Sequence, residues 1–189
     1  TVRGLAINGE IVGSAAQPGA AIVIETPVGG NTISDNYIGT DARGLSAQPC
    51  GTGIVLYNGA VNTVIDHNVL AGNSYDAIEV WGSGTNGTQV RANLIGLGPW
   101  SATAIPNGRY GIRITQDAQG TVVGGQTDYR NIISGNGESG VYLSDVTATE
   151  VSHNYIGTGV DGDDDMGNGW HGVAIEGTST TNFVNNNVI

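Results

Sequence analysis

The sequence contains no lysine, and six arginines face 17 acidic residues, which gives a net charge of -11. Proteins that bind nucleic acid or anionic membrane surfaces use a basic surface to do so, and this composition therefore argues against both partners. A single cysteine cannot form an internal disulfide, so cysteine says nothing about compartment. No apolar run approaches the length of a transmembrane helix, and we expect no membrane insertion.

Large apolar side chains are also scarce, with one Phe and one Met against 32 Gly in 189 residues. The length suits one domain with a sizeable core, but this composition is poor material for a conventional globular centre. We therefore expect a repetitive architecture. Both ends look like bare strands without polar caps, and no signal peptide is visible. We expect residues 1–189 to form a single domain that is a segment of a longer chain.

Two short patterns alternate along the whole sequence. The first reads aliphatic, two variable residues, Asn, any residue, aliphatic, as in "ISDNYI" and "VSHNYI". The second reads as "GIVL" or "GVYL". Its anchors precede the next first-pattern anchor by 10 to 12 residues. The connection from the Asn of the first pattern to the following second-pattern anchor comes in two lengths, a short one and one that is about eight residues longer. The first-pattern anchors are Val2, Ile33, Ile65, Val90, Val123, Val151 and Val184, and the second-pattern anchors are Ile22, Ile54, Ile78, Ile112, Val141 and Val173.

Short β-branched segments separated by Gly, Asn, Asp, Ser and Thr indicate strands rather than helices. A constant repeat with insertions on one edge is typical of a solenoid whose loops share one face. Leucine-rich repeats have a similar length, but Leu is scarce and no helical segment is visible. The sequence predicts an all-β protein, a right-handed single-stranded parallel β-helix of about six to seven rungs.

The recurring asparagine of the first pattern has a structural role in this fold. At a bend between strands, its side chain can bond backbone groups and the same residue on the next rung, for about 1 kcal/mol per bond. Leu5 takes this place in the first rung, where the ladder is expected to begin or end. The predicted asparagine ladder comprises Asn36, Asn68, Asn93, Asn131, Asn154 and Asn187.

The stretches "NTISDNYIGTDARG", "RNIISGNGESGVYL" and "VSHNYIGTGVDGDDDMGNG" resemble the right-handed parallel β-helix repeats of secreted and cell-surface bacterial proteins, within the pectate-lyase-like superfamily. The resemblance covers essentially the whole chain and implies an extracellular or cell-surface location. It does not imply one activity, because lyases, polygalacturonases, epimerases, tailspikes and adhesin stalks share this architecture. The polygalacturonase-like motif order and the epimerase-like Asp-Pro-His-Glu string are absent.

The first strand of each repeat is expected to point an apolar residue outward on every rung. We call this row the apolar stripe. It is either covered by the long loops, as a buried parallel strand would be, or used for lateral docking, since large exposed apolar patches usually mark interfaces. Its members are Ala6, Tyr37, Val69, Leu94, Ile132, Tyr155 and Val188.

The second strand of each repeat points polar and aromatic residues outward. Glu79 and Arg113 fall on adjacent rungs and are expected to pair. Aromatic residues beside them would form a platform for sugar rings, or would merely shield the sheet. The binding candidates are Tyr57, Glu79, Trp81, Arg113 and Tyr142, with Trp100 and Trp170 from the long loops.

The segment "DGDDD" carries four aspartates within five residues. Its alternating acids match the opening of an EF-hand loop, but Met166 stands where that loop needs Gly and Gly172 where it needs Glu. A looser Ca²⁺ site and a solvated acidic bulge both remain open. The metal candidates are Asp161, Asp163, Asp164 and Asp165.

No catalytic residue is assigned from the sequence. The weak candidates are Asp66 with His67 on a first strand, one rung from Asp35, and His171 beside the acidic segment, because a carboxylate with a His can do acid–base work. His153 repeats the position of His67, which indicates a scaffold position.

The sequence therefore favours a structural or binding segment for adhesion, surface coating or rod assembly, with further copies or rungs and polysaccharide as partners. The alternative is a carbohydrate-active enzyme, namely a lyase, hydrolase or epimerase, that acts on an acidic polysaccharide with Ca²⁺. That alternative requires the acidic segment or His171 to converge on the aromatic face of the second strands in a cleft.

Overall fold

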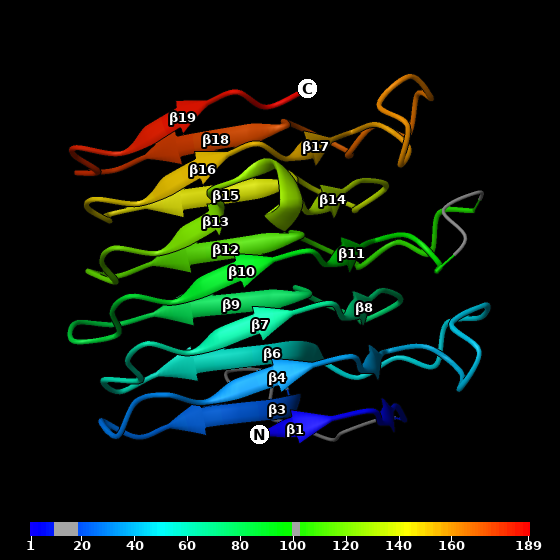
Figure 1. Cartoon of the computed structure of the whole chain (residues 1–189), viewed down its shortest axis with the longest axis horizontal. Coiled ribbons are helices and arrows are strands. Elements are labelled where there is room, and N and C mark those ends of the chain that lie inside the picture. Colours follow the sequence, from blue (N-terminus) through cyan, green and yellow to red (C-terminus); the bar gives the residue numbers. More distant parts are fainter. Residues whose placement is uncertain (10–18, 100–102) are drawn as a thin grey trace.

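The computed structural model describes residues 1–9, 19–99 and 103–189 of the chain. The chain winds as a parallel β-solenoid, in which each turn adds one strand to each of three parallel sheets (Figure 1). The predicted all-β parallel β-helix is confirmed. Among the described residues, no helix is long and apolar enough to cross a membrane.

The three sheets follow the two sequence patterns. The first sheet contains β1 (Val2–Arg3), β4 (Thr32–Ser34), β7 (Val64–Asp66), β10 (Gln89–Arg91), β13 (Val122–Gly124), β16 (Glu150–Ser152) and β19 (Phe183–Asn185). The second sheet contains β2 (Ala6–Ile7), β5 (Tyr37–Ile38), β8 (Val69–Leu70), β11 (Leu94–Ile95), β14 (Ile132–Ile133) and β17 (Tyr155–Ile156). The third sheet contains β3 (Ala20–Glu25), β6 (Thr52–Tyr57), β9 (Ile78–Trp81), β12 (Ile112–Thr115), β15 (Val141–Ser144) and β18 (Val173–Glu176).

The strand register agrees with the predicted anchors. Val123 begins a repeat in which the stretch "VVGGQTDYRNII" carries extra residues before Asn131, and it still pairs with Val90 on one side and Val151 on the other. The insertion in that repeat forms a short 3-10 helix at Thr127–Tyr129, outside the ladder of strands. The expected count of six to seven rungs is slightly high, because the first and last strands of each six-stranded sheet are separated by about five turns.

The interior of the coil is filled by small and medium aliphatic side chains. The anchors of both patterns point inward, and Ile65, Ile78 and Ile112 are completely buried. The main core cluster of buried residues consists of Ile, Leu, Val and Ala. Stacking identical aliphatic layers buries enough surface without large aromatic residues, which explains how so little Phe and Met suffices.

The predicted asparagine ladder is confirmed along its full length. Each Asn side chain donates to the side-chain oxygen of the next, over 2.9 to 3.0 Å from Asn36 to Asn187. The ladder starts at Asn36, as the Leu5 replacement predicted, because the main-chain N–H of Leu5 donates to Asn36 Oδ1 at 3.1 Å and its side chain has no amide to continue the ladder.

A second asparagine ladder, which the sequence reading missed, runs along the other end of the long loops. Its side chains donate from one rung to the next over 2.8 to 2.9 Å. Each of its residues stands five positions before a second-pattern anchor, and that constant spacing was a usable signal. The members of this second ladder are Asn73, Asn107, Asn136 and Asn168.

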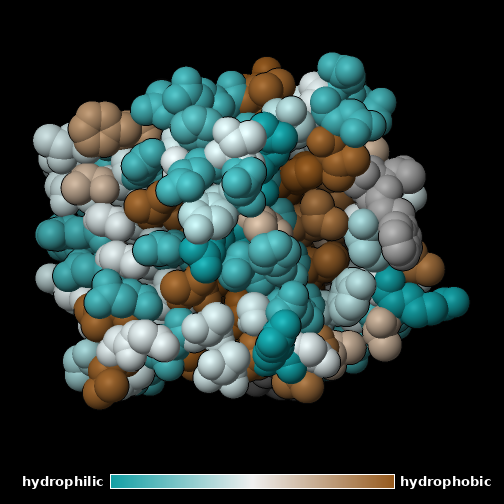
Figure 2. All heavy atoms as spheres, viewed as in Figure 1, coloured by the Kyte–Doolittle hydropathy of each residue, from teal (hydrophilic) through white to brown (hydrophobic). Residues whose placement is uncertain are grey.

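The long loops leave the second sheet on one side of the coil, at the right of Figure 1. Within the described residues, three of these loops begin with a small antiparallel bridge, between Thr40 and Ala47, Leu97 and Ala104, and Thr158 and Asp165. Ile105 from the middle loop packs with Val69 and Ala71, so the protein covers the middle of the apolar stripe itself. Figure 2 shows apolar atoms gathered in this region, right of centre over β8, β11 and β14.

Candidate functional site

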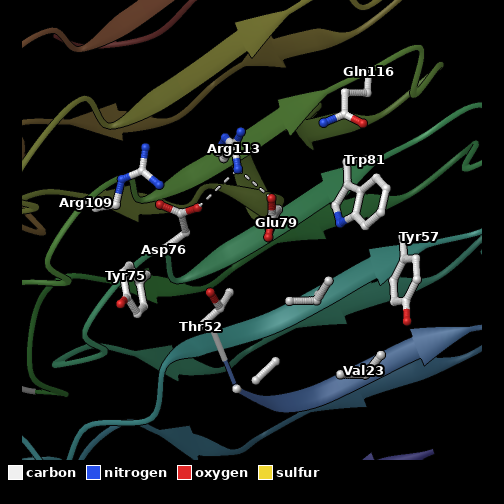
Figure 3. Close-up of a pocket in the computed structure, with 13 residues that line it drawn as sticks. Val23, Thr52, Tyr57, Tyr75, Asp76, Glu79, Trp81, Arg109, Arg113 and Gln116 are labelled. Carbon is white, nitrogen blue, oxygen red and sulfur yellow. Dashed lines mark hydrogen bonds and ion pairs between the residues drawn. The ribbon is translucent and has the colours of Figure 1, made fainter. Parts of the chain in front are cut away.

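A groove of about 620 Å³ lies on the outer face of the third sheet (Figure 3), and we call it the third-sheet groove. It spans β3, β6, β9 and β12 and the segments that lead into them. Its lining residues are Gly19, Ala20, Val23, Thr52, Val55, Tyr57, Tyr75, Asp76, Glu79, Trp81, Arg109, Arg113 and Gln116. Four of the predicted binding residues, Tyr57, Glu79, Trp81 and Arg113, thus come together in one concave surface.

Aromatic rings form one wall of the groove. Tyr57 and Trp81 end neighbouring strands in the same register, so their rings stack with centroids 4.8 Å apart and planes 7° from parallel. The Tyr57 hydroxyl donates to Glu25 on the next strand at 2.6 Å, and Asn58 donates to the same carboxylate at 2.7 Å. These bonds lower the pKa of Glu25 and fix the position of the Tyr57 ring.

Charged side chains lie across the groove from these rings (Figure 3). Arg113 Nη1 donates to Glu79 Oε1 at 2.6 Å, which confirms the predicted pair between adjacent strands. Both side chains are largely covered, with exposed fractions of 17% for Glu79 and 26% for Arg113. Burial raises the pKa of Glu79, and the neighbouring Arg113 opposes this effect.

The Asp76 carboxyl group is almost completely buried beside the charged pair. Its side chain is 3% exposed, and desolvation raises its pKa to about 6, opposed by a hydrogen bond from the Tyr110 N–H and by the two arginines. Oδ1 accepts that N–H at 3.1 Å, while Oδ2 lies 4.0 Å from Arg113 Nη1. Because 4.0 Å is beyond hydrogen-bond distance, Oδ2 has room for another donor.

Arg109 completes the charged side of the groove. Its Nε lies 3.5 Å from Glu138 Oε1, and its guanidinium lies 5.1 Å from the ring centroid of Tyr110. Tyr110 in turn stacks on Tyr142 with centroids 4.6 Å apart. The predicted binding residue Tyr142 therefore supports the site from the next rung and does not line the groove.

The sequence reading missed Asp76, Tyr75 and Arg109 as lining residues of one site. They lie just before the second-pattern strands, in positions that backbone hydrogen bonds bring into register: the Arg109 N–H donates to the Tyr75 carbonyl, and the Ala77 N–H donates to the Tyr110 carbonyl. The sequence signal for these three residues was their place, two or three residues before a second-pattern anchor, where the residue type changes from rung to rung.

The remaining binding and catalytic candidates on this side lie elsewhere. Trp170 holds the place on its rung that Tyr75, Arg109 and Glu138 hold on theirs, because its N–H donates to the Glu138 carbonyl. The residue is 65% exposed and does not line the groove. His171, next to it in the chain, also stays outside the lining. Trp100 lies outside the described residues.

The Asp66 and His67 pair forms on a different sheet. His67 Nδ1 lies 2.8 Å from Asp66 Oδ1, and Arg91 Nε lies 3.5 Å from the same oxygen. Asp35, one rung away, instead accepts from Arg3 at 2.8 Å. Asp66 is on the first sheet, so the pair and the third-sheet groove do not share one site.

The acidic segment occupies the tip of a loop hairpin. The Asp165 backbone bridges to Thr158, and the Gly159 N–H donates to the Asp164 carbonyl at 3.1 Å. Over residues 1–9, 19–99 and 103–189, no three His, Cys, Asp or Glu side chains gather as a metal site would require. Calcium binding by Asp161, Asp163, Asp164 and Asp165 stays a prediction. None of the four lines the third-sheet groove, so the convergence that the enzyme alternative required is not seen there.

Comparisons with known proteins show which fold this chain shares, but they do not show which family it belongs to. No protein-family model and no curated protein matches the sequence. Among solved structures, the periplasmic alginate epimerase AlgG matches with a TM-score of 0.63, and a double mutant of AlgG with 0.66, both at 16% sequence identity. The alignments cover 89 to 90% of this chain but only 36% of those chains. At this identity the likeness shows a shared parallel β-helix fold.

Proposed function

We propose that this chain binds a polysaccharide in the third-sheet groove, as a segment of an extracellular or cell-surface β-helical protein. The observation that carries the proposal is the stacked Tyr57–Trp81 wall facing the Asp76, Glu79 and Arg113 cluster across one concave surface. Concave sites that combine aromatic surface with a few convergent polar groups are the usual form of small-molecule and glycan sites.

The two sides of the groove suit the two kinds of surface on a sugar. The C–H face of a sugar ring packs against an aromatic ring, and Val23 and Val55 extend this apolar surface. Sugar hydroxyls form charge-assisted hydrogen bonds with carboxylate and guanidinium groups, which are stronger than neutral ones. The groove spans four strands, about 14 Å along the coil, so it accepts an extended chain rather than one isolated sugar.

The structural neighbours support this class of ligand and this location. AlgG is described as a periplasmic alginate epimerase, so a coil of the same fold acts on a polysaccharide outside the cytoplasm. For the present chain these remain proposals, since the shared part is one third of the AlgG length and the identity is low.

The proposal is tested by calorimetric titration and affinity electrophoresis against soluble polysaccharides of different composition. We expect saturable binding to at least one of them, and about tenfold weaker binding after Trp81→Ala, because the stacking surface is lost. Unchanged melting temperature of the variant shows that the fold is intact. An absence of binding to every polymer, or equal affinity of wild type and variant, contradicts the proposal.

A carbohydrate-active enzyme is a second candidate, favoured by one specific observation. Asp76 has a pKa near 6 and shares Arg113 Nη1 with Glu79, at 4.0 and 2.6 Å, so the two carboxyl groups have oxygens within 6.6 Å of each other. A pair of neighbouring carboxyl groups serves the acid and base roles in glycoside hydrolysis. New reducing ends in a bound polysaccharide, lost in Asp76→Asn, would establish this activity; intact polymer after long incubation would rule against it.

A further inference from the structure

We infer, resting on the proposed function, that the third-sheet groove selects uncharged polysaccharides and discriminates against polymers of uronic acids. This assignment concerns the charge class of the ligand at that site. It departs from the substrate named for the structural neighbour, alginate, and it follows from how the charges in and beside the groove are arranged.

The positive charges at the groove are already matched by carboxylates. Arg113 is held by Glu79 at 2.6 Å, and Arg109 lies 3.5 Å from Glu138. Asp76 adds a third carboxyl group to these two arginines and lies 4.0 Å from Arg113. The cluster therefore has three acidic groups for two basic ones, and it offers no excess positive charge to a bound anion.

No other basic side chain supplies the missing charge. The sequence has no lysine, and the other four arginines do not line the groove. All four have partners elsewhere: Arg3 binds Asp35, Arg43 lies 3.7 Å from Asp41, Arg91 lies against Asp66 and Tyr129, and Arg130 lies 4.0 Å from the Tyr155 ring. The net charge of -11 further repels a polyanion at low ionic strength.

A uronate carboxylate would have to compete with Glu79 for Arg113. Displacing Glu79 would leave a carboxylate that is 17% exposed without its partner, and a charge left unpaired in a covered position is strongly unfavourable. A second carboxylate placed beside the intact pair would meet Asp76 and Glu79 as like charges. Both arrangements work against an acidic polymer.

A hydroxyl group avoids both costs because it brings no charge. It can donate to Asp76 Oδ2, which is beyond hydrogen-bond distance from Arg113, and accept from a free guanidinium N–H. Gln116 adds a neutral donor and acceptor to the lining, while Val55 and the aromatic wall are placed to contact the apolar ring face. The polar groups of the groove thus complement a neutral, hydroxyl-rich chain.

The test compares neutral and acidic polymers on the same protein. Wild-type chain is titrated calorimetrically with galactomannan, xyloglucan and mixed-linkage β-glucan, and with alginate and polygalacturonate, at low salt in calcium-free buffer and again with calcium. We expect at least one neutral polymer to bind about tenfold or more tightly than either polyuronate in both buffers.

One substitution should remove most of this preference for neutral polymers. Glu79→Gln removes the carboxylate bonded to Arg113 and leaves Asp76, 4.0 Å away, as its nearest acidic neighbour. We expect this variant to bind polyuronate about tenfold more tightly, with an affinity that falls as salt is added. Glu150→Gln is the matched control, since it removes the same charge from β16 of the first sheet, where the Glu150 carboxylate accepts a hydrogen bond from the Ser152 hydroxyl. We expect that control to leave both affinities unchanged within about twofold.

The outcomes separate the two proposals. Wild-type protein that binds a polyuronate as tightly as the best neutral polymer, with or without calcium, overturns the charge selection but keeps polysaccharide binding. Equal gains in Glu79→Gln and Glu150→Gln also overturn it, because the effect would then come from net charge alone. Binding to none of the five polymers overturns the proposed function and the selection with it.

Discussion

The asparagine ladders and the third-sheet groove are built on the same repeating coil in opposite ways. In the ladder from Asn36 to Asn187, every rung carries the same residue with the same bonds. In the groove, the equivalent positions on successive rungs hold Val55, Glu79 and Arg113, three side chains of different chemistry. Identical residues give a continuous network that stabilises the coil. The groove, where residue types change from rung to rung, is the site that we propose for a ligand.

The largest expected loss of stability follows from a substitution in the buried asparagine ladder. Asn93→Ala removes the bonds of its amide to Asn131 and to the Ile65 and Arg91 carbonyls, at 2.8 to 3.0 Å, and leaves buried partners unpaired. We expect a loss of about 3 kcal/mol in the free energy of unfolding, measured by urea denaturation. Asn185→Ala, at an exposed position of β19, is the control and should change it by less than about 0.5 kcal/mol. Equal losses in the two variants would contradict the ladder's role.

A substitution in the groove should change the free energy of unfolding in the opposite direction, towards greater stability. The pKa of Asp76 is raised in the folded state from 3.8 to about 6, so its contribution to stability is present below pH 4 and is lost as the pH rises through 6. Asp76→Asn should therefore stabilise the protein at pH 8 by on the order of 2 kcal/mol and have little effect at pH 4. Urea denaturation at both pH values measures this difference, and a variant that tracks wild type at every pH would refute it.

Substitution of two tryptophans, both named as binding candidates from the sequence, should affect polysaccharide affinity to different extents. Trp81 lines the groove and stacks on Tyr57, whereas Trp170 is exposed and outside the lining. We expect Trp81→Ala to weaken polysaccharide binding about tenfold and Trp170→Ala to weaken it less than about twofold. Calorimetric titration with the tightest-binding polymer measures both constants. The reverse order would move the site from the sheet face to the loop edge.

We expect the smallest effect on stability from a substitution in the acidic loop tip, which is part of neither the ladders nor the groove. Asp163 is exposed, and Asp163→Asn should change the free energy of unfolding by less than about 0.5 kcal/mol in calcium-free buffer. Titration of wild type and variant with calcium checks the metal prediction for this segment. Heat that appears with wild type and disappears in the variant would establish a site there, and identical flat titrations would remove it.

The contrast between the regular ladders and the irregular groove also explains how much of the structure could be predicted from the sequence. Repetition made the fold, the strand register and the first ladder readable, since each anchor and each Asn recurs at a constant place. The second ladder was equally regular, five residues before the anchors, and was missed because its segments, such as the one around Asn107, lie in the variable connections.

The groove was predicted only in part. Glu79 and Arg113 were found because alternation along a strand says which side chains point outward and the repeat says which are neighbours. Asp76 and Arg109 could not be assigned, because they precede the strands and their direction depends on how each loop returns to the coil. Burial of Asp76, the cause of its raised pKa, is likewise a property of the packed turn and not of the local sequence.

The central claim is that a polysaccharide lies against the aromatic wall of the third sheet, and the three tryptophans of the chain provide a direct measurement. Their indole N–H signals in a nitrogen–proton NMR spectrum are assigned with single Trp→Phe variants and followed during titration with the tightest-binding polysaccharide. We predict that the Trp81 signal shifts progressively to saturation while that of Trp170 stays in place. A shift of Trp170 with an unchanged Trp81 would contradict the account.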